Sequence, residues 1–403
     1  MQGALQGVRV LDLTRILAGP YACQTLADLG AEVIKVERPG RGDDSRAWGP
    51  PFQKDAQGND TSDSIYYLCC NRGKRSITAD LSRPEGQNLI KQLSLKSDVL
   101  VENYKVGDLK RYGLDYESLR QENPRLVYCS ITGFGQDGPY AARPGYDPVV
   151  QAMGGLMSVT GERESDPQRV GVAVTDKITA LYAVIAIQAA LRYRDLTGQG
   201  QHIDLALLDV QLASMINVAQ NYLSTGAVGK RNGNPHPSVM PSQSFVCADG
   251  WVMLAAGNDS QFEKLCHALE APELAKDERF RTNAARLRHG QELTALVEGI
   301  TRTRPAKWWM DKLSEEGVPC GKVQDIAQAF ADPQVRHRGI RVELGNEGQA
   351  GVPAVASPLR LSASPVRYER PPPRLGEHTD QVLGDVLGLD AGEISALRGS
   401  GVI

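Results

Sequence analysis

The sequence has almost no net charge. Its 403 residues include 45 Lys and Arg and 48 Asp and Glu, which gives a formal charge of −3 at pH 7. A protein without a global basic field does not attract nucleic acid or an anionic membrane surface over long range, so an anionic ligand needs a local cluster of cations. We therefore expect neither nucleic acid nor a membrane as a partner.

Spacings typical of metal and redox sites are also lacking. The seven cysteines are scattered without a CxxC pair, and the six histidines form no pair at helical spacing. Zinc sites and disulfide exchange use ligands or thiols at such short spacings. We therefore predict no metal site, and the unpaired cysteines favour a reducing cytoplasm.

No hydrophobic run in the sequence is long enough to span a bilayer. The most apolar helical stretch, 180–191, contains fewer than the ~20 residues that span a membrane, so it predicts a buried helix. The N-terminal segment has no charged leader followed by a long apolar core. We expect the mature protein to begin here and to be cytoplasmic.

What the sequence does contain is an alternation of apolar runs and helical stretches. Strands are predicted at 8–13, 32–36, 98–102, 126–131 and 202–206, with helices between the first four at 19–30, 86–97 and 116–121. Such alternation is typical of a mostly parallel sheet covered by helices on both faces. The fold class predicted is α/β, with a Rossmann-like large domain.

A change in composition predicts a domain boundary. Residues 224–243 are rich in Gly, Asn, Pro and Ser, and a hairpin at 244–254 and charged helices within 261–315 follow. This favours a smaller α+β domain. We predict a first part of the large domain over 1–223, the small domain over 224–330, and a C-terminal segment, 331–403, that returns to the large domain.

A nicotinamide enzyme is the obvious alternative for a Rossmann-like sheet. Its pyrophosphate site needs G-x-G-x-x-G in the first turn between strand and helix, because the phosphates approach the backbone closely. The turn here, LTRILAGPYA, has one glycine. The dinucleotide interpretation is therefore disfavoured, while the sheet is retained.

Asp176 lies at the start of a long apolar helix predicted over 176–194. Aspartate is a preferred residue at helix N-termini, so a capping role is one interpretation. The helix dipole would also keep its carboxylate ionised, which covalent acyl transfer through a carboxylate requires. The two interpretations are compatible.

Basic residues concentrate in the first 111 positions, largely at or just after predicted strand ends. In open α/β sheets ligands bind at the carboxyl ends of the strands. Most surface cations are merely solvated, so the pattern alone leaves both interpretations open. The residues are Arg38, Arg41, Arg46, Arg72, Lys74, Arg75, Lys105, Lys110 and Arg111.

A series of longer motifs, in order and over nearly the whole chain, resembles the family III CoA transferases of the CaiB/BaiF type. This resemblance implies a transferase of sulfur-containing groups that moves CoA between carboxylic acids, with acyl-CoA and acids as substrates, CoA as carrier and no metal. It also implies an interlocked homodimer. The motifs are GVRVLDLTRILAGPYACQTLADLGAEVIKVERPGRGDDSRAWGPP, NRGKRSI, VENYKVGDLKRYGLDY, YCSITGFGQDGP, PGYD, GLMSVTGE, GVAVTD, TGQGQHIDLALLD and PPPRLGEHT.

The resemblance implies roles for individual residues. Asp176 matches the family's nucleophile, which forms an aspartyl acyl anhydride and then an aspartyl-CoA thioester. Arginine forks suit phosphate oxygens, and a tyrosine can stack on adenine. The CoA-binding residues implied are Leu17, Ala18, Arg38, Ala79, Asp80, Leu81, Ser82, Asn103, Tyr104, Arg111, Gly145, Tyr146 and Asp147.

Two departures bear on the substrate. Formyl-CoA transferases carry glutamine where this chain has Leu17, and a glycine run where it has GNDSQF, so oxalate chemistry is doubtful. AWGPP, YCSITGFGQ and GNPHPSVMPSQSF resemble instead the succinyl-CoA:glutarate branch, which implies short dicarboxylates. The far carboxylate needs a partner when buried. Arg46, Trp48 and His236 are the candidates, although Arg46 could equally pair with Asp43 or Asp44.

A racemase and a non-catalytic CoA-binding protein are the two alternative functions. The α-methylacyl-CoA racemases of the same superfamily use a histidine in a GHD sequence, where this chain has Gly145, Tyr146 and Asp147. A tyrosine with a pKa near ~10 is a poor base at neutral pH, so the transferase is favoured. A non-catalytic CoA-binding protein is the second alternative, and the presence of Asp176 argues against it.

Overall fold

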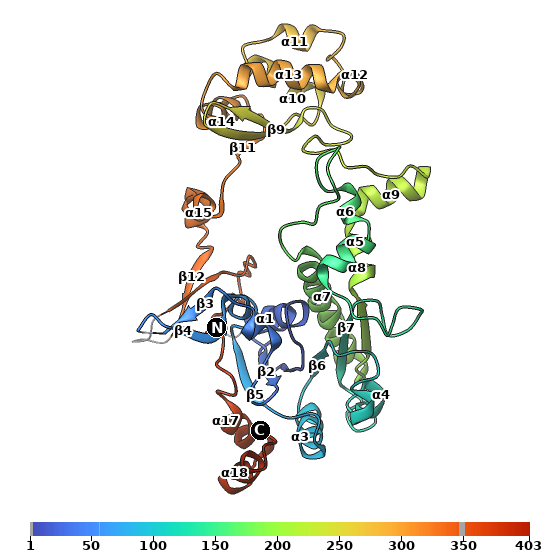
Figure 1. The fold of residues 1–403 in the computed structure, drawn as a ribbon, viewed down its shortest axis with the longest axis vertical. Coiled ribbons are helices and arrows are strands. Elements are labelled where there is room, and N and C mark those ends of the chain that lie inside the picture. Colours follow the sequence, from blue (N-terminus) through green and yellow to red (C-terminus); the bar gives the residue numbers. More distant parts are fainter. Residues whose placement is uncertain (1–2, 56, 346–350) are drawn as a thin grey trace. The chain divides into compact units, whose positions relative to one another are not determined.

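The computed structural model describes residues 3–55, 57–345 and 351–403, and they form two compact units (Figure 1). The large unit is drawn from Met1–Leu156, Val170–Thr225 and Arg338–Ile403, and the inserted unit from Met157–Arg169 and Gly226–His337. The predicted boundaries had placed 331–337 in the C-terminal segment of the large domain, whereas these residues belong to the inserted unit. They had also placed 157–169 in the first domain. These residues belong to the inserted unit instead, because Gly161 O accepts from Gly233 N and Arg163 donates to Asn232.

A six-stranded sheet forms the centre of the large unit. Its order is β5-β2-β1-β6-β7-β8, and every neighbouring pair is parallel, with Val10 opposite both Val33 and Val99. The predicted α/β class with a mostly parallel sheet is confirmed. The strands are β1 (Arg9–Asp12), β2 (Glu32–Glu37), β5 (Lys74–Thr78), β6 (Val99–Glu102), β7 (Val127–Thr132) and β8 (His202–Ala206).

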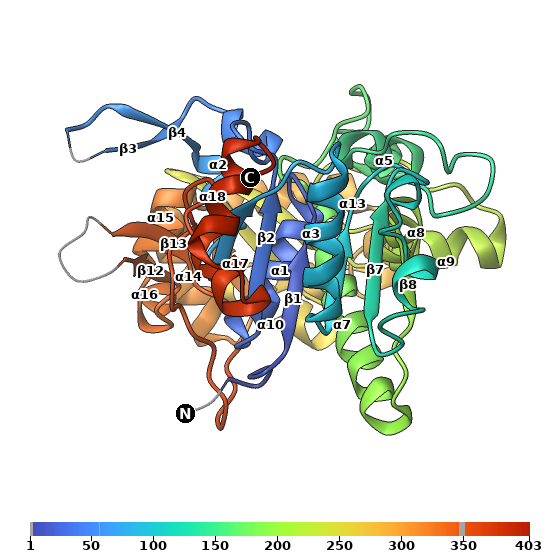
Figure 2. The same ribbon diagram turned by 90° about the horizontal axis from the view of Figure 1, so that it is seen from below.

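Helices cover both faces of this sheet, because successive strand residues point to opposite sides and both sets are apolar. Val10, Val99 and Val127 pack with one group of helices, and Leu11 and Leu100 with the other. Figure 2 shows helices on both sides of the sheet. The first group is α1 (Ala18–Asp28) and α7 (Val174–Thr197). The second is α3 (Pro84–Leu95), α4 (Tyr116–Leu119), α17 (Thr379–Leu387) and α18 (Ala391–Gly399).

The C-terminal stretch packs on the large unit beside β5. His378 N donates to Ser76 O, and Asp80 N donates to Val402 O. The other elements of the large unit are short. They are η1 (Asp44–Ala47), β3 (Phe52–Lys54), β4 (Asp60–Ser64), α2 (Ile65–Leu68), η2 (Lys110–Tyr112), α5 (Asp147–Met153), α8 (Leu207–Ser214), α9 (Ile216–Thr225), β12 (Arg341–Leu344) and β13 (Val352–Val355).

Helix α7 is longer than the sequence indicated. It has 24 residues, and by length and apolar composition it is the one helix among the described residues that could cross a membrane. The expectation of a stretch too short for a bilayer is therefore wrong. Ala180, Ala183 and Ile187 nevertheless lie buried in the core of the large unit, where α7 packs against α1.

The inserted unit has its own core around a three-stranded antiparallel sheet, in the order β11-β10-β9. Phe245, Phe262, Phe280 and Trp309 are fully or almost fully buried in it. Its elements are β9 (Ser242–Cys247), β10 (Gly250–Ala255), α10 (Asp259–Ala268), α11 (Glu273–Lys276), α12 (Asn283–Arg288), α13 (Gly290–Thr301), α14 (Ala306–Glu315), β11 (Cys320–Lys322), α15 (Ile326–Ala331) and α16 (Pro333–His337). The short α6 (Leu156–Val159) leads into this unit along the chain.

Candidate active site

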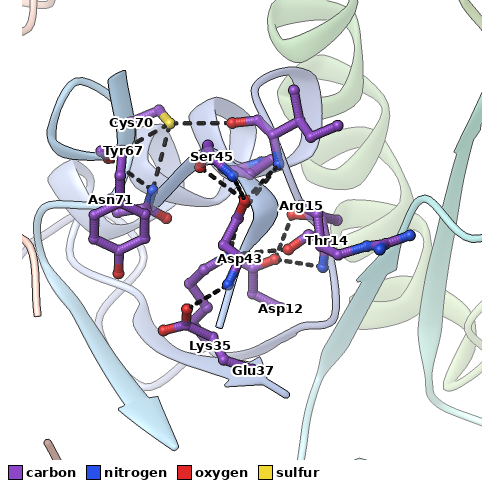
Figure 3. Close-up of polar contacts among 12 residues, drawn as sticks. Asp12, Thr14, Arg15, Lys35, Glu37, Asp43, Ser45, Tyr67, Cys70 and Asn71 are labelled. Carbon is purple, nitrogen blue, oxygen red and sulfur yellow. Dashed lines mark hydrogen bonds and ion pairs between the residues drawn. The ribbon is translucent and has the colours of Figure 1, made fainter. Parts of the chain in front are cut away.

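A buried network of charges lies beneath the loop after β1 (Figure 3). Lys35 Nζ lies 2.9 Å from Asp43 Oδ2, and Lys74 Nζ lies 2.8 Å from Asp12 Oδ2, with all four side chains fully enclosed. Burial alone would lower the pKa of the Lys35 ammonium, but the charge of Asp43 raises it above its usual value. The Lys35–Asp43 pair is therefore ionic. Burial would raise the pKa of Asp12, but the charges of Lys74 and Lys35 lower it, and Asp12 Oδ1 also accepts from Thr14 N at 2.9 Å.

This network holds Ile16 in an unusual backbone conformation. Its φ is 75°, which is unfavourable for a β-branched residue and persists only where the surroundings enforce it. Asp43 Oδ1 accepts from Ile16 N at 3.1 Å, and Cys70 Sγ donates to Ile16 O at 3.5 Å. The contacts fix the next two residues, Leu17 and Ala18, where α1 begins.

A cavity of about 310 Å³ opens at the carboxyl ends of β1, β2, β5 and β6. In parallel sheets this edge is where ligands bind. Of the predicted CoA-binding residues, the structure brings six to its wall, and it adds Arg15, Arg41 and Tyr112, which were not predicted for the CoA site. The six are Arg38, Ala79, Asp80, Leu81, Ser82 and Tyr104.

The cations of this cavity suit an anionic ligand. Arg38 and Arg41 are exposed, and neither has a carboxylate partner among the residues that the structure describes. Hydrogen bonds from Ser82 and the charge of Arg38 lower the pKa of Asp80, so this carboxylate stays ionised beside them. Phosphate oxygens are the group that two free guanidinium forks recognise best.

The remaining predicted CoA residues do not line this cavity. Asn103 braces the loop after β1, because its Oδ1 accepts from Arg15 N at 2.9 Å and its Nδ2 donates to Arg15 O at 2.8 Å. Arg111 is exposed and pairs with Asp108. The residues outside the lining are Leu17, Ala18, Asn103, Arg111, Gly145, Tyr146 and Asp147.

Asp176 lies in the first turn of α7 and is half-buried. It is not the cap of that helix. The N-cap residue is Ala173, and the carboxylate that satisfies the helix is Asp147 Oδ2, which accepts from Thr175 N at 2.8 Å and from Asp176 N at 3.2 Å. The capping interpretation of Asp176 is therefore wrong, and no pattern local to α7 indicates the real cap.

The Asp176 carboxyl is also less acidic than expected. Burial, and then the negative charge of Asp147, raise its pKa to about 7. The sequence had suggested that the helix dipole keeps this carboxylate ionised. The lost hydration and the like charge work against ionisation, so both protonation states are populated near neutral pH.

The phenol of Tyr66 lies near Asp176. Burial and the charge of Asp176 raise the pKa of the Tyr66 phenol, so it remains a neutral hydrogen-bond donor. The ring of Trp48, 43% exposed, meets that of Tyr66 edge-on with centroids 5.2 Å apart. The structure thus places Trp48, a predicted substrate residue, next to Tyr66, which the sequence analysis missed.

Arg46, the first of the three candidates for the substrate carboxylate, is engaged elsewhere. It is 4% exposed, and its guanidinium donates to Glu37 Oε1 at 2.7 Å, to Asp63 Oδ1 at 2.5 Å and to Tyr67 Oη at 2.6 Å. The predicted alternative partners, Asp43 and Asp44, are not the ones it uses. A structural ion pair therefore replaces the predicted substrate contact.

His236, the third candidate, belongs to the inserted unit. It is exposed, and its Nδ1 accepts from Ser238 N at 3.1 Å. Its other ring nitrogen has no partner among the described residues. The structure thus leaves this side chain available for a ligand of the inserted unit.

Comparison with known proteins shows the family of this chain. The model of CoA-transferase family III matches residues 5–379. The chain belongs to this family. It is 51% identical to a succinate–glutarate CoA-transferase of Agrobacterium fabrum over 95% of both chains, and 43% identical to the human succinyl-CoA:glutarate CoA-transferase over 99% of this chain and 90% of the relative.

Solved structures support the same assignment. A CAIB/BAIF family protein from Brucella suis is 48% identical, with a TM-score of 0.87 over 96% of this chain and 100% of that one. As a family III CoA-transferase, the protein acts on acyl-CoA and carboxylate substrates, and CoA is its substrate and carrier. The described residues contain no cluster of three His, Cys, Asp or Glu that could hold a metal ion.

Proposed function

We propose that this family III CoA-transferase moves CoA from succinyl-CoA to a short dicarboxylate such as glutarate, with Asp176 as the nucleophile. The observation that carries the proposal is the Asp176 carboxyl, half-buried in the first turn of α7, in a chain 51% identical to a succinate–glutarate CoA-transferase. A carboxyl whose pKa is raised to about 7 is more basic than an ordinary aspartate and is a stronger nucleophile once ionised.

The proposed transfer proceeds by successive acyl-transfer steps and involves no oxidation or reduction. An Asp176 oxygen attacks the thioester carbonyl, the CoA thiolate leaves, and an aspartyl acyl anhydride remains. The thiolate then attacks the Asp176 carbonyl, which releases the donor acid and leaves an aspartyl-CoA thioester. The acceptor carboxylate attacks this thioester to form a second anhydride, and the returning thiolate attacks its acyl carbonyl to give the new acyl-CoA and free Asp176.

The cavity beside Arg38 and Arg41 is the proposed site for the phosphates of CoA, with Tyr104 in its wall. Asn103, Leu17 and Ala18 would contribute through the backbone of the adjoining loop. In this proposal Arg111, Gly145 and Tyr146 contact parts of CoA that extend beyond the cavity. The binding energy comes from charge-assisted hydrogen bonds between guanidinium groups and phosphate oxygens.

Replacing Arg38 by Gln should weaken acyl-CoA binding without disturbing chemistry. The loss of one charge-assisted bond, about 1.5–3 kcal/mol, corresponds to an increase in KM for acyl-CoA of roughly tenfold or more, at nearly constant kcat. Steady-state kinetics with varied succinyl-CoA measures this. Arg341→Gln, on an exposed strand where the side chain pairs with Glu343, is the matched control. An equal effect in both variants would contradict the phosphate site.

The acceptor preference tests the dicarboxylate assignment. A site built for two carboxylates leaves polar groups unpaired with a monocarboxylate, so glutarate should exceed butyrate in kcat/KM by about tenfold or more. Trp48, whose ring packs edge-on against Tyr66, is the proposed contact of the acid, and Trp48→Ala should reduce that ratio. Initial rates with succinyl-CoA and each acid provide the measurement. Equal rates for both acids would refute the dicarboxylate assignment and leave CoA transfer itself intact.

We also propose that the enzyme is an interlocked homodimer in the cytoplasm. Large apolar side chains on the outward side of α7 are between 42% and 67% exposed in the single chain, and a soluble protein normally covers such a surface. The seven cysteines are all unpaired, which suits a reducing compartment. The exposed side chains are Leu181, Tyr182, Ile185, Tyr193 and Leu196.

A further inference from the structure

Asp147, the first residue of α5, reaches the start of α7 although it lies 28 positions before Thr175. It is 4% exposed. Its Oδ2 accepts from the backbone N–H groups of Thr175 and Asp176, and its Oδ1 accepts from Gln151 Nε2 at 2.6 Å. Both oxygens are thus used inside the protein, and none of these contacts involves the cavity assigned to CoA.

The surrounding bonds fix this carboxylate and the helix it caps. Gln151 Oε1 accepts from Val170 N at 2.9 Å, which sets the orientation of the Gln151 amide. Thr175 Oγ1 donates to Gln211 Oε1 of α8 at 2.6 Å. Two other helices therefore hold the first turn of α7, which has no side-chain cap of its own.

We propose that Asp147 is a positioning residue for Asp176, because it fixes the turn that carries the nucleophile and places a second negative charge beside it. This inference rests on the proposed role of Asp176 as nucleophile. It gives Asp147 a function other than the contact with CoA that the family resemblance implied.

The second charge has a chemical consequence. Two nearby carboxylates repel while both are ionised, and the repulsion ends when Asp176 becomes a neutral anhydride or thioester. Asp147 therefore raises the energy of free Asp176 relative to its covalent intermediates. Both directions of transfer pass through those intermediates, so the effect serves either substrate.

The other titratable groups around Asp176 do not replace this effect. Tyr66 of α2 stays neutral, because its pKa is raised by burial and by the nearby charges. Lys177 follows Asp176 on α7, with its Nζ 3.2 Å from the ring centroid of Tyr21 of α1. Burial lowers the pKa of Lys177 to about 8, so its titration lies above that of Asp176.

The test is the pH dependence of covalent adduct formation in single turnovers. In the unmodified enzyme the rate should fall below pH 7, since the Asp176 carboxyl has a pKa of about 7 and must be ionised to attack. Asp147→Asn retains an oxygen for the two N–H groups but removes the charge. The fall of the rate at acid pH, the acid limb of the profile, should therefore move to lower pH. The rate at pH 6 relative to pH 8 should then rise, by up to roughly tenfold.

A second variant protects the test against misfolding. In Asp147→Asn the new side-chain amide would face the Gln151 amide, and the bond between the two side chains would be lost. In the double variant D147N/Q151E a carboxylate at 151 accepts from that amide and from Val170 N, so the hydrogen bonds remain and the charge moves away from Asp176. Its acid limb should lie between those of the single variant and the unmodified enzyme.

Asp147→Ala removes the cap and the charge together. It should move the limb as Asn does but also lower kcat at every pH, and the recovery of kcat in Asp147→Asn would separate the two effects. The inference would be overturned if Asp147→Asn lowered the rate by the same factor at every pH and left the acid side of the pH profile unmoved, in both the single and the double variant. The inference would also be overturned if the only change in Asp147→Asn were a raised KM for acyl-CoA. If Asp176→Asn is inactive in the same assay, such results leave the proposed nucleophile standing.

Discussion

Replacing Asp176 by Asn should reduce CoA transfer by at least about 1,000-fold, because an amide cannot form the anhydride or the thioester. Turnover of succinyl-CoA with glutarate measures the loss, and intact-mass spectrometry should show a CoA adduct on the unmodified enzyme and none on Asp176→Asn. Asp195→Asn, near the other end of α7 and exposed, is the matched control. Normal turnover in Asp176→Asn would remove the nucleophile assignment.

Asp176→Asn should also change how the stability of the protein depends on pH. The folded-state pKa of Asp176 is raised from 3.8 to about 7, so the native state favours the protonated carboxyl. Its stabilising contribution is present at low pH and is lost as pH rises toward 7. Asn does not titrate. The melting temperature of Asp176→Asn relative to the unmodified enzyme should therefore increase between about pH 4 and pH 8.

Replacing Arg46 by Met should destabilise the large unit severely. It leaves the Glu37 carboxylate, 1% exposed, and the Asp63 carboxylate without their cation. Breaking a buried ion pair from one side costs about 3–5 kcal/mol, since the remaining charge stays in a poorly hydrated site. Equilibrium unfolding in urea measures the change.

The exposed pair of Arg341 and Glu343 supplies the comparison, because Arg341→Met should change stability by less than about 1 kcal/mol. A stable Arg46→Met enzyme that had lost its preference for dicarboxylates would reverse our conclusion. It would restore Arg46 as a substrate residue despite its internal partners.

Five of the six strands of the central sheet were predictable from their apolar residues. The sixth, β5 (Lys74–Thr78), was not predicted, because its sequence KRSIT contains a single apolar residue. The predicted segments 32–36 and 98–102 correspond to β2 (Glu32–Glu37) and β6 (Val99–Glu102), and the predicted 202–206 is β8. The short hairpins β3–β4 and β12–β13 were not foreseen in detail. Their strands are partly exposed and contain only 3 to 5 residues each, which is too short for a pattern of alternation to stand out.

The candidate site was harder to predict, because its decisive contacts connect distant positions. Sequence proximity suggested Asp43 or Asp44 for Arg46, whereas the guanidinium uses Glu37, 9 residues away, and the carbonyl of Pro373, 327 residues away. The cap of α7 comes from another helix in the same manner. Residue type indicated which groups carry charge, but only the fold determines which of them remain free for a ligand.

The large unit is assembled from three separated stretches of chain, and this affects how it can form during synthesis. Gly73 N bonds to Arg370 O, and Asp80 N bonds to Val402 O, so the edge of the sheet beside β5 lacks these partners until Arg370 and Val402 have left the ribosome. The inserted unit is complete earlier, at His337. The N-terminal half must therefore wait in an incomplete state with apolar surface uncovered, which is the condition in which nascent chains depend on chaperones.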